Sequence, residues 1–315
     1  MRIFRGIRRS PHPHGCVLTI GTFDGVHLGH QTLIRKLAEQ GRHLGLPVTI
    51  ALFEPQPREY FQPELAPARL YRLREKVQAL AALPVDSTLV LRFNRSLADL
   101  PPEEFIQRIL VEGLNVKYLV VGDDFRFGRG RSGDFALLRR AGEQVGFTVT
   151  DTPTYTLEQR RISSTWVREA LQAGDCAKAA RLLGRPYAVS GRVIHGNQRG
   201  RLLGFPTANL ALRRTNAPLS GVFAVTLHGI DGQALAGVAN VGVRPTLTGD
   251  TTVLLETHVF DFQRDIYQRL VEVRFHAKLR DEQRFASVEE LRAQIQTDAE
   301  AARRFFAGSS ILARQ

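Results

Sequence analysis

Cysteine is nearly absent from this chain, which has only Cys16 and Cys176 among its 315 residues. Two cysteines so far apart give neither a disulfide framework nor the paired spacing of a zinc site. The count therefore fits a reducing compartment, and we expect a cytoplasmic protein.

Long apolar runs are lacking too. No run approaches the roughly 20 residues that cross a membrane. The basic start, Met1-Arg2-Ile3-Phe4-Arg5, is not followed by the apolar segment of a secretory signal. We therefore expect no membrane partner. Internal repeats and low-complexity segments are also missing, so the length predicts about two globular domains.

Acidic residues are in deficit: 31 Asp and Glu against 43 Lys and Arg give a formal net charge of +12. Such a charge suits a nucleic-acid partner or polyanionic small substrates such as ATP. The basic residues are spread along the whole chain, with only short clusters such as residues 126–131. We therefore expect phosphorylated small molecules and no nucleic acid.

Strand-like and helix-like segments alternate in the first half. Strands are predicted at 17–20, 48–53, 88–93 and 117–122, and helices at 31–40, 72–83, 102–113 and 134–144. The alternation predicts an α/β domain with a parallel sheet and helices on both faces. Ligands bind such sheets outside the carboxyl ends of the strands.

The pattern changes after about residue 183. Short segments rich in β-branched and aromatic residues follow, at 187–195, 222–227, 234–241, 253–260 and 270–275. They predict an antiparallel barrel or sandwich. A terminal helix is expected over 287–306, with Ser287 and Glu290 spaced as in a capping box. The change near Gly184-Arg185-Pro186 predicts domains 1–183 and 184–315.

The most informative segment is Gly21-Thr22-Phe23-Asp24-Gly25-Val26-His27-Leu28-Gly29-His30, between a predicted strand and a predicted helix. Free N–H groups and the dipole at a helix start favour a bound phosphate. His27 and His30 add hydrogen bonds or charge there, and Gly25 and Gly29 leave room for the phosphate. This suits attack on the α-phosphate of a nucleotide, although two histidines in an ordinary turn are the alternative.

A hydroxyl-rich run, Ile162-Ser163-Ser164-Thr165-Trp166-Val167-Arg168, predicts the cap of a helix whose first turn presents Arg168. Hydroxyls and a helix start bind phosphate oxygens, and arginine adds charge for a leaving pyrophosphate. A plain helix cap with a surface arginine is the alternative.

These two segments resemble the two signatures of the nucleotidylyltransferase superfamily. The longer string Gly-Thr-Phe-Asp-Gly-Val-His-x-Gly-His is similar to the branch of bacterial bifunctional riboflavin kinases/FAD synthetases. The resemblance implies a Rossmann-like first domain with His27, His30 and Arg168 as catalytic residues. It implies ATP and phosphate binding by Gly21, Phe23, Asp24, Gly29, Ser163, Ser164 and Thr165.

Two further segments of the first half resemble that family. Residues 121–128 are similar to its flavin-nucleotide pocket, which implies that Asp124 and Phe125 bind flavin; an acid pair in a turn is the alternative. Residues 53–59 match except that Gln56 stands where the family usually has His. Residues 128–133 have Gly-x-Gly-x-x-Gly spacing but form no tight strand-to-helix turn, so we do not interpret them as a dinucleotide site.

The second half contains no P-loop, but Gly200-Arg201-Leu202-Leu203-Gly204-Phe205-Pro206-Thr207-Ala208-Asn209 resembles riboflavin kinase. Thr207 and Asn209 offer the oxygen ligands that Mg²⁺ prefers. The resemblance implies that Glu256 takes a proton from a hydroxyl that attacks a γ-phosphate, and an ordinary surface glutamate on a strand is the alternative. Gln268 departs from the family's usual Gly. The resemblance implies flavin binding by Arg280 and ATP binding by Gly191, Gly196, Gly200, Gly204, Thr207 and Asn209.

The resemblance spans residues 17–305 and implies two reactions. The C-terminal barrel would phosphorylate riboflavin to FMN, and the N-terminal domain would transfer AMP from ATP to FMN, giving FAD and pyrophosphate, with Mg²⁺ at both sites. Two alternatives stay open. One is an adenylyl- or cytidylyltransferase for another phosphorylated acceptor, and the other is a flavin-responsive regulator that binds nucleic acid.

Overall fold

The computed structural model describes residues 1–6, 12–152, 154–196, 200, 204–212, 216–245, 251–309 and 311. Arg201, Leu202 and Leu203 of the glycine-rich motif lie outside the described residues. The chain forms two compact units. Unit 1 comprises Met1–Pro67 and Arg72–Ile162, and unit 2 comprises Ala68–Tyr71 and Ser163–Gln315.

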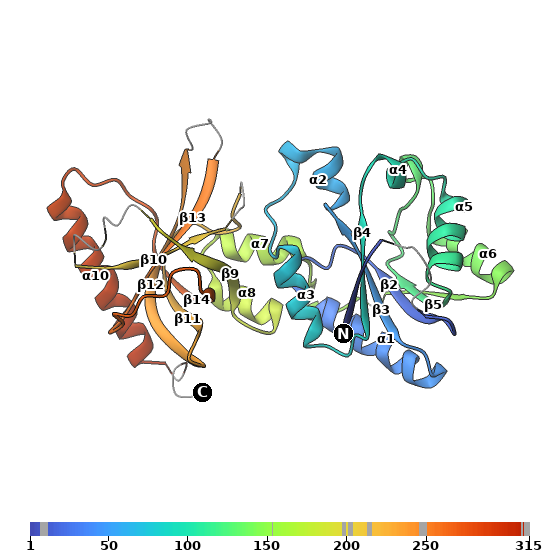
Figure 1. The fold of residues 1–315 in the computed structure, drawn as a ribbon, viewed down its shortest axis with the longest axis horizontal. Helices are drawn as coiled ribbons and strands as arrows, with labels where there is room; N and C mark the ends of the chain where they lie inside the picture. Colours follow the sequence, from blue (N-terminus) through green and yellow to red (C-terminus); the bar gives the residue numbers. More distant parts are fainter. Residues whose placement is uncertain are drawn as a thin grey trace. The chain divides into compact units, whose positions relative to one another are not determined.

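Unit 1 is built on a sheet of six parallel strands (Figure 1). This confirms the predicted α/β domain. The two edge strands were not predicted, because each has only four residues, most of them exposed or half-buried. The strands in spatial order are β1 (Arg2–Arg5), β4 (Ser87–Arg92), β3 (Val48–Glu54), β2 (Cys16–Ile20), β5 (Val116–Val121) and β6 (Thr148–Asp151).

Helices cover both faces of this sheet. Helix α1 (Leu28–Leu44) buries Leu33, Ile34 and Leu37, the three residues that share one helical face in the sequence. On the other face Leu110 and Leu138 join the strand core. The remaining helical elements are α2 (Pro57–Phe61), α3 (Leu73–Ala81), α4 (Arg95–Ala98), α5 (Pro102–Phe105), the π-helix η3 (Ile106–Gly113), α6 (Phe135–Val145) and the 3₁₀ turns η1 (Asp24–Val26), η2 (Pro63–Leu65) and η4 (Arg129–Arg131).

The strand order has a reversal at β2. From β2 the chain proceeds to β3 and β4 on one side, and then crosses to β5 and β6 on the other. Ligands of open parallel sheets bind at such a switch point, outside the carboxyl ends of the strands. The turn that joins β2 to α1, which carries His27 and His30, lies there.

Unit 2 contains a closed antiparallel barrel, so the barrel rather than the sandwich is confirmed. Helix α10 (Val288–Ala307) begins at Ser287, whose Oγ accepts from the N–H of Glu290 at 3.1 Å, and packs against the outside of the barrel (Figure 1). The strands in barrel order are β10 (Thr207–Ala211), β13 (Thr251–Val259), β12 (Gln233–Pro245), β11 (Gly221–Ile230), β14 (Leu270–Arg280) and β9 (Tyr187–Ile194).

Two further helices belong to unit 2. Helix α7 (Ser164–Gln172) packs on α8 (Cys176–Leu183), and α8 packs on β9 and β14 of the barrel. Tyr187 is fully buried, and its hydroxyl donates to the carbonyl of Leu70 at 3.0 Å. The compact units therefore divide at Ile162/Ser163, whereas 183/184 stays a prediction for the functional domains. A small hairpin of unit 1 precedes this division, β7 (Thr156–Leu157) with β8 (Arg160–Arg161).

No helix among the described residues is long and apolar enough to cross a membrane.

Candidate active sites

The turn after β2 has an unusual backbone. Phe23 and Val26 adopt positive φ angles of 46° and 44°, and Gly25 between them has 79°. A β-branched residue in this region is strained, and such strain gathers at functional sites where the surroundings enforce it. Phe23 and Val26 are buried, so packing holds the turn in place. The turn delivers His27 to the start of α1.

His27 and His30 form a stacked pair at that start. Their ring centroids are 3.6 Å apart with an interplanar angle of 17°, and Nδ1 of His27 accepts from the backbone N–H of His30 at 3.3 Å. The Nδ1 atom of His30 is buried and has no hydrogen-bond partner among the described residues. An unsatisfied ring nitrogen beside free helix N–H groups is a position where a phosphoryl oxygen would be bound.

The electrostatics at His30 favour an incoming anion. Burial, and then the positive charges of His27, Lys76 and Arg161, hold the pKa of His30 well below its ordinary value. Lys76 is itself fully buried on α3, which packs against η1. Burial by itself disfavours charge of either sign, but the positive charges of Lys76 and Arg161 near His30 attract the negative charge of a polyphosphate.

The glycines of the turn keep this position open. A Cβ on Gly29 would lie 3.2 Å from Nδ1 of His27, and one on Gly21 would lie 3.1 Å from the ring of Phe23. Asp24 is buried in the same turn. The structure thus brings together six of the predicted residues in this turn: Gly21, Phe23, Asp24, His27, Gly29 and His30.

The second predicted signature lies in unit 2. Oγ of Ser163 accepts from the N–H of Trp166 at 3.2 Å, which caps α7 as the sequence indicates. Nε of Arg168 donates to the carbonyl of Ala68 at 2.6 Å, and Thr165 is exposed. Because the two signatures fall in different compact units, their joint action stays a prediction.

An aromatic pocket of about 720 Å³ lies at the carboxyl ends of β3 and β4 in unit 1. Phe125 lines this pocket, as expected for a flavin-binding residue, whereas Asp124 is not among the lining residues. Gln56 also lines it. Six phenylalanines supply most of the apolar wall: Phe53, Phe61, Phe93, Phe105, Phe125 and Phe127.

A helix-side cavity and a loop-side cavity lie around strand β10 in the described part of unit 2. The helix-side cavity, about 320 Å³, is lined by the barrel wall and by α10 residues such as Leu291 and Ile295. The loop-side cavity, about 540 Å³, is lined by residues 262–267 between β13 and β14. Thr207 and Asn209 line both cavities. These two side chains therefore lie where the contents of the cavities would meet.

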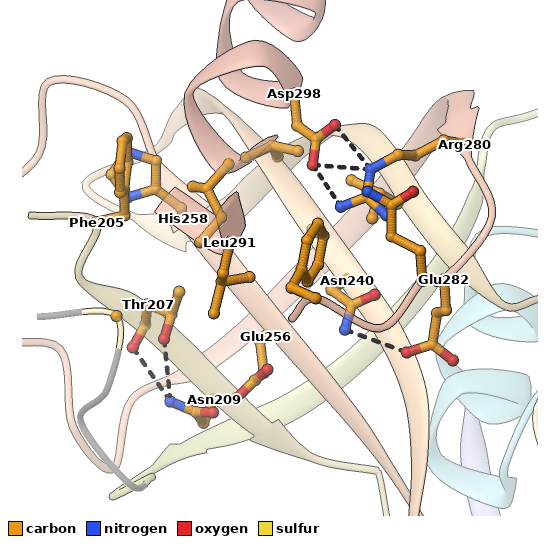
Figure 2. Close-up of a pocket in the computed structure, with 17 residues that line it drawn as sticks. Phe205, Thr207, Asn209, Asn240, Glu256, His258, Arg280, Glu282, Leu291 and Asp298 are labelled. Atoms are coloured by element: carbon orange, nitrogen blue, oxygen red, sulfur yellow. Dashed lines mark hydrogen bonds and ion pairs between the residues drawn. The ribbon is translucent and has the colours of Figure 1, made fainter. Parts of the chain in front are cut away.

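Successive side chains of β13 point to opposite faces of the strand, and each face lines one of the two cavities. Glu256 and His258 line the helix-side cavity, and Thr257 and Val259 line the loop-side cavity. Glu256 on β13 is the cross-strand partner of Asn209 on β10, and the two side chains lie beside each other (Figure 2). The structure thus brings together the predicted base and the predicted oxygen ligands.

Asn209 has the free acceptor that a hard cation needs. Its Nδ2 donates toward the backbone carbonyl and Oγ1 of Thr207, at 3.3 and 3.4 Å. Its Oδ1 is buried and has no hydrogen-bond partner in the described part of the chain. Amide and hydroxyl oxygens suit Mg²⁺, so these two residues fit a divalent metal that ATP would bring. The described residues contain no cluster of three His, Cys, Asp or Glu side chains for a resident metal.

Arg280 lies in the helix-side cavity, where it is paired with Asp298 (Figure 2). The predicted glycines divide: Gly200 lines the helix-side cavity and Gly196 the loop-side cavity. Gly191 lies under Leu210, where a Cβ would come within 3.3 Å, and Gly204 adopts a φ of +86°. Neither of these two is among the residues that line the cavities, and their binding of ATP stays a prediction.

Several residues of these sites were missed by the sequence reasoning. Asp298 and Asn240 line the helix-side cavity, and Asn240 donates to Glu282 at 3.4 Å (Figure 2). Lys76 lies near His30, and Thr257 has a fully buried hydroxyl in the loop-side cavity. The available signal was a polar residue within an apolar strand or helix pattern, which Asn240 provides within 234–241.

Comparison with known proteins matches both halves. The sequence model of the FAD synthetase family matches residues 9–166, and that of the riboflavin kinase family matches residues 183–306. The bifunctional riboflavin kinase/FMN adenylyltransferase of Escherichia coli K12 is 52% identical over 308 residues, 97% of this chain and 98% of that protein. The Pseudomonas fluorescens protein of the same name is 51% identical over 311 residues, 98% and 99%.

A solved structure supports the same fold. A Streptococcus pneumoniae chain, titled a macrolide-efflux protein, has a TM-score of 0.80 and 32% sequence identity. The match covers 96% of this chain and 99% of that one.

Proposed function

Because this chain belongs to the bifunctional riboflavin kinase/FMN adenylyltransferase family, we propose which of its residues carry each of the two reactions. The enzyme phosphorylates riboflavin to FMN with ATP and then adenylylates FMN to FAD. Both family models match in chain order, so another acceptor for the first half and a nucleic-acid-binding regulator are no longer needed as explanations.

For the kinase reaction, riboflavin occupies the helix-side cavity and ATP the loop-side cavity. The observation that carries this assignment is that Thr207 and Asn209 line both. The apolar helix-side wall suits a flavin ring. Glu256 accepts the proton of the ribityl 5′-hydroxyl as that oxygen bonds to the γ-phosphorus and ADP leaves.

Thr207 and Asn209 would hold the divalent metal at this boundary. Their oxygens are of the hard type, and Oδ1 of Asn209 has no hydrogen-bond partner among the described residues. The metal would supply charge neutralisation on the phosphate oxygens. Mg²⁺ is the ion we expect.

For the adenylyl transfer, the aromatic pocket takes the flavin ring of FMN. A phosphate oxygen of FMN attacks the α-phosphorus of ATP, and the bond to pyrophosphate breaks. His27, His30 and the first N–H groups of α1 bind the phosphate oxygens, and Gly21 and Gly29 leave room. Phe23 and Asp24 shape the turn. We assign Ser163, Ser164, Thr165 and Arg168 to the triphosphate from the resemblance of their motif.

The functional division that we propose is 1–183 for adenylyl transfer and 184–315 for the kinase. The family models, which end at 166 and begin at 183, are compatible with it. Helix α8 packs on β9 and β14 of the barrel, and α7 packs on α8.

Product analysis tests the function directly. Purified protein is incubated with riboflavin, ATP and Mg²⁺, and FMN and FAD are followed by chromatography. We expect FMN to appear first and FAD to accumulate from it. Formation of FMN without FAD, also when FMN is supplied, would remove the adenylyl-transfer assignment. FAD formation from FMN with no phosphorylation of riboflavin would remove the kinase assignment.

A further inference from the structure

Gln56 is a buried polar residue that the two reactions described above do not use. Only Pro55 separates it from the end of β3, and it precedes Pro57, the first residue of α2, at the carboxyl edge of the sheet. Its backbone N–H donates to the carboxylate of Glu59 at 2.9 Å, which fixes its position at the helix start. Only 8% of the residue is exposed.

The amide nitrogen of Gln56 has no acceptor. Its Nε2 is buried, and no described residue accepts a hydrogen bond from it. A side-chain amide carries two N–H donors, and leaving buried donors unpaired is costly. Such an orphan in a native structure indicates a partner supplied from outside the chain, and Gln56 lines the aromatic pocket.

Thr22, Gln62 and Asp99 also line this pocket, but phenylalanines make up most of its apolar wall. Phe53, Phe61 and Phe93 form one group of edge-packed rings, with centroids 5.6 Å apart from Phe53 to Phe93 and from Phe61 to Phe93. Phe105, Phe125 and Phe127 form a second group. Stacking on phenylalanine is tolerant of the ring that is bound.

The basic residues of the pocket suit a different part of a ligand. Four arginines line it, and all four are exposed: Arg58, Arg126, Arg129 and Arg131. Exposed guanidinium groups suit a phosphate group that remains partly in water. Gln56 is the buried glutamine of the pocket and is a neutral donor at every pH, so it suits a neutral acceptor on the ring.

We propose that Nε2 of Gln56 donates a hydrogen bond to a carbonyl oxygen on the polar edge of the flavin ring, and so selects FMN as the acceptor of AMP. This inference rests on the proposed assignment of the aromatic pocket to FMN. Gln56 is a specificity-determining residue: it orients the ring without touching the reacting phosphates.

The test compares three single variants of the full-length enzyme, with FMN supplied directly. Gln56→Met keeps the length and removes the donor, and Gln56→Glu keeps the shape but accepts when ionised. Gln144→Met makes the same chemical change at an exposed position of α6. We expect Gln56→Met to raise the KM for FMN by about tenfold to a hundredfold, the effect of leaving one buried hydrogen-bonding group unpaired. In the Gln56→Met enzyme, the KM for ATP and the rate of riboflavin phosphorylation should stay within twofold of wild type. In the Gln144→Met enzyme, the KM for FMN should also stay within twofold of wild type.

The Gln56→Glu enzyme separates hydrogen bonding from packing. A glutamate carboxyl has an ordinary pKa of about 4.3, and burial raises it. The KM for FMN of this variant, relative to wild type, should therefore fall as pH is lowered from 8 to 5.5, because the protonated carboxyl becomes a donor. A purely structural role would leave that ratio flat.

Flavin analogues test the same contact without mutation. FMN in which sulfur replaces one ring carbonyl oxygen, at either of the two positions, is a poorer acceptor. One of the two should raise KM in the wild-type enzyme and have no further effect in Gln56→Met. The proposal is overturned if Gln56→Met folds and keeps a wild-type KM for FMN, or if both analogues behave like FMN. Wild-type FAD formation from FMN then still supports the proposed function, whereas its absence would overturn that function instead.

Discussion

Arg280 and Asp298 form a bidentate ion pair in the lining of the helix-side cavity. Nε of Arg280 donates to both carboxylate oxygens at 2.9 and 3.1 Å, and Nη2 donates to Oδ2 at 2.7 Å. Nη1 donates to the carbonyl of Asp281 at 2.8 Å, and Gln294 adds a further hydrogen bond to Asp298. The pair ties the end of β14 to α10. Of the five N–H groups of Arg280 two remain for a ligand, so its predicted contact with flavin depends on those.

Asp298→Asn should weaken this connection. The change leaves a half-buried guanidinium with a neutral acceptor, and we expect a loss of about 2–4 kcal/mol of stability and a higher KM for riboflavin. FAD formation from supplied FMN should not change. Thermal melting and steady-state kinetics measure these effects. The control is Asp261→Asn, which weakens the exposed ion pair with Arg303 and should lower stability far less, because both charges stay in water. Equal effects of the two variants would contradict the prediction.

Nearly every long helix and strand was predicted from the sequence as the correct type, because the pattern of apolar residues within each segment indicates it. The buried strands β2, β3 and β5 are apolar runs, and α1 shows one apolar face. Strand β1 was missed because its burial depends on pairing with β4, far along the chain. The membership of α7 and α8 in unit 2 was missed for the same reason: packing on β14 has no signature in the helices themselves.

The candidate sites were predictable where a motif is continuous. The turn from Gly21 to His30 and the Thr207–Asn209 segment each place several residues in one site. Residues such as Asp298 and Gln56 come from other elements, and only the folded chain shows that they line the cavities. Gln56 was noticed as a departure from the family pattern, but its unsatisfied amide is a property of the packed structure.

The two activities should separate by mutation. His30→Ala together with Arg168→Ala removes a buried imidazole from the α1 start and a cation from α7, and neither residue lines the barrel cavities. We expect loss of FAD formation by at least about 100-fold, as for removal of positioned catalytic groups, with FMN formation nearly unchanged. Chromatography of both products measures this. Equal loss of both activities in a folded variant would contradict the assignment of these residues.

Thr207→Ala and Asn209→Asp should each impair riboflavin phosphorylation. The first removes a hydroxyl oxygen from a residue that lines both cavities, and the second replaces the amide Nδ2 that donates to Thr207 with a carboxylate oxygen that cannot donate. Rates measured across a Mg²⁺ titration should show the largest defect at limiting metal. Wild-type rates at limiting Mg²⁺ would remove that residue from the proposed metal site. Asn115→Asp, a change of the same kind in unit 1, is the control for the second variant.

Glu256→Gln should lower the kcat of FMN formation and leave FAD formation from FMN unchanged. A general base contributes about 10²–10⁴-fold, and the amide keeps the shape of the carboxylate while it removes the proton acceptor. The loose character of phosphoryl transfer favours the lower end of this range. Stopped assays at saturating riboflavin measure kcat separately from KM. A folded variant within about threefold of wild type, far below that contribution, would leave Glu256 with a positioning role only.

A polar cluster on the outside of the barrel should make stability depend on pH. Oγ1 of Thr226 is within 2.9 Å of Nε2 of both His228 and His276. Burial, with the positive charges of His228 and Arg274, lowers the pKa of His276 to about 4. Burial and Arg274 also lower the pKa of His228, against the opposing effect of Glu272. Both histidines are therefore neutral in the folded protein at neutral pH.

Protonation of these histidines favours the unfolded chain. The ordinary pKa of His276 is 6.5, so between pH 6.5 and about 4 the unfolded state binds the extra proton. Stability is thus fully present above pH 6.5 and falls as pH is lowered toward 4. Because His276 is only partly buried, we expect its contribution to this loss to be about 1–2 kcal/mol. Urea unfolding at pH 7, 5.5 and 4.5 measures the free energy of unfolding, which should decline less steeply with falling pH in His276→Gln than in wild type. His14 is an exposed histidine, and His14→Gln should show the same decline as wild type. An unchanged slope in His276→Gln would show that other groups set the acid sensitivity.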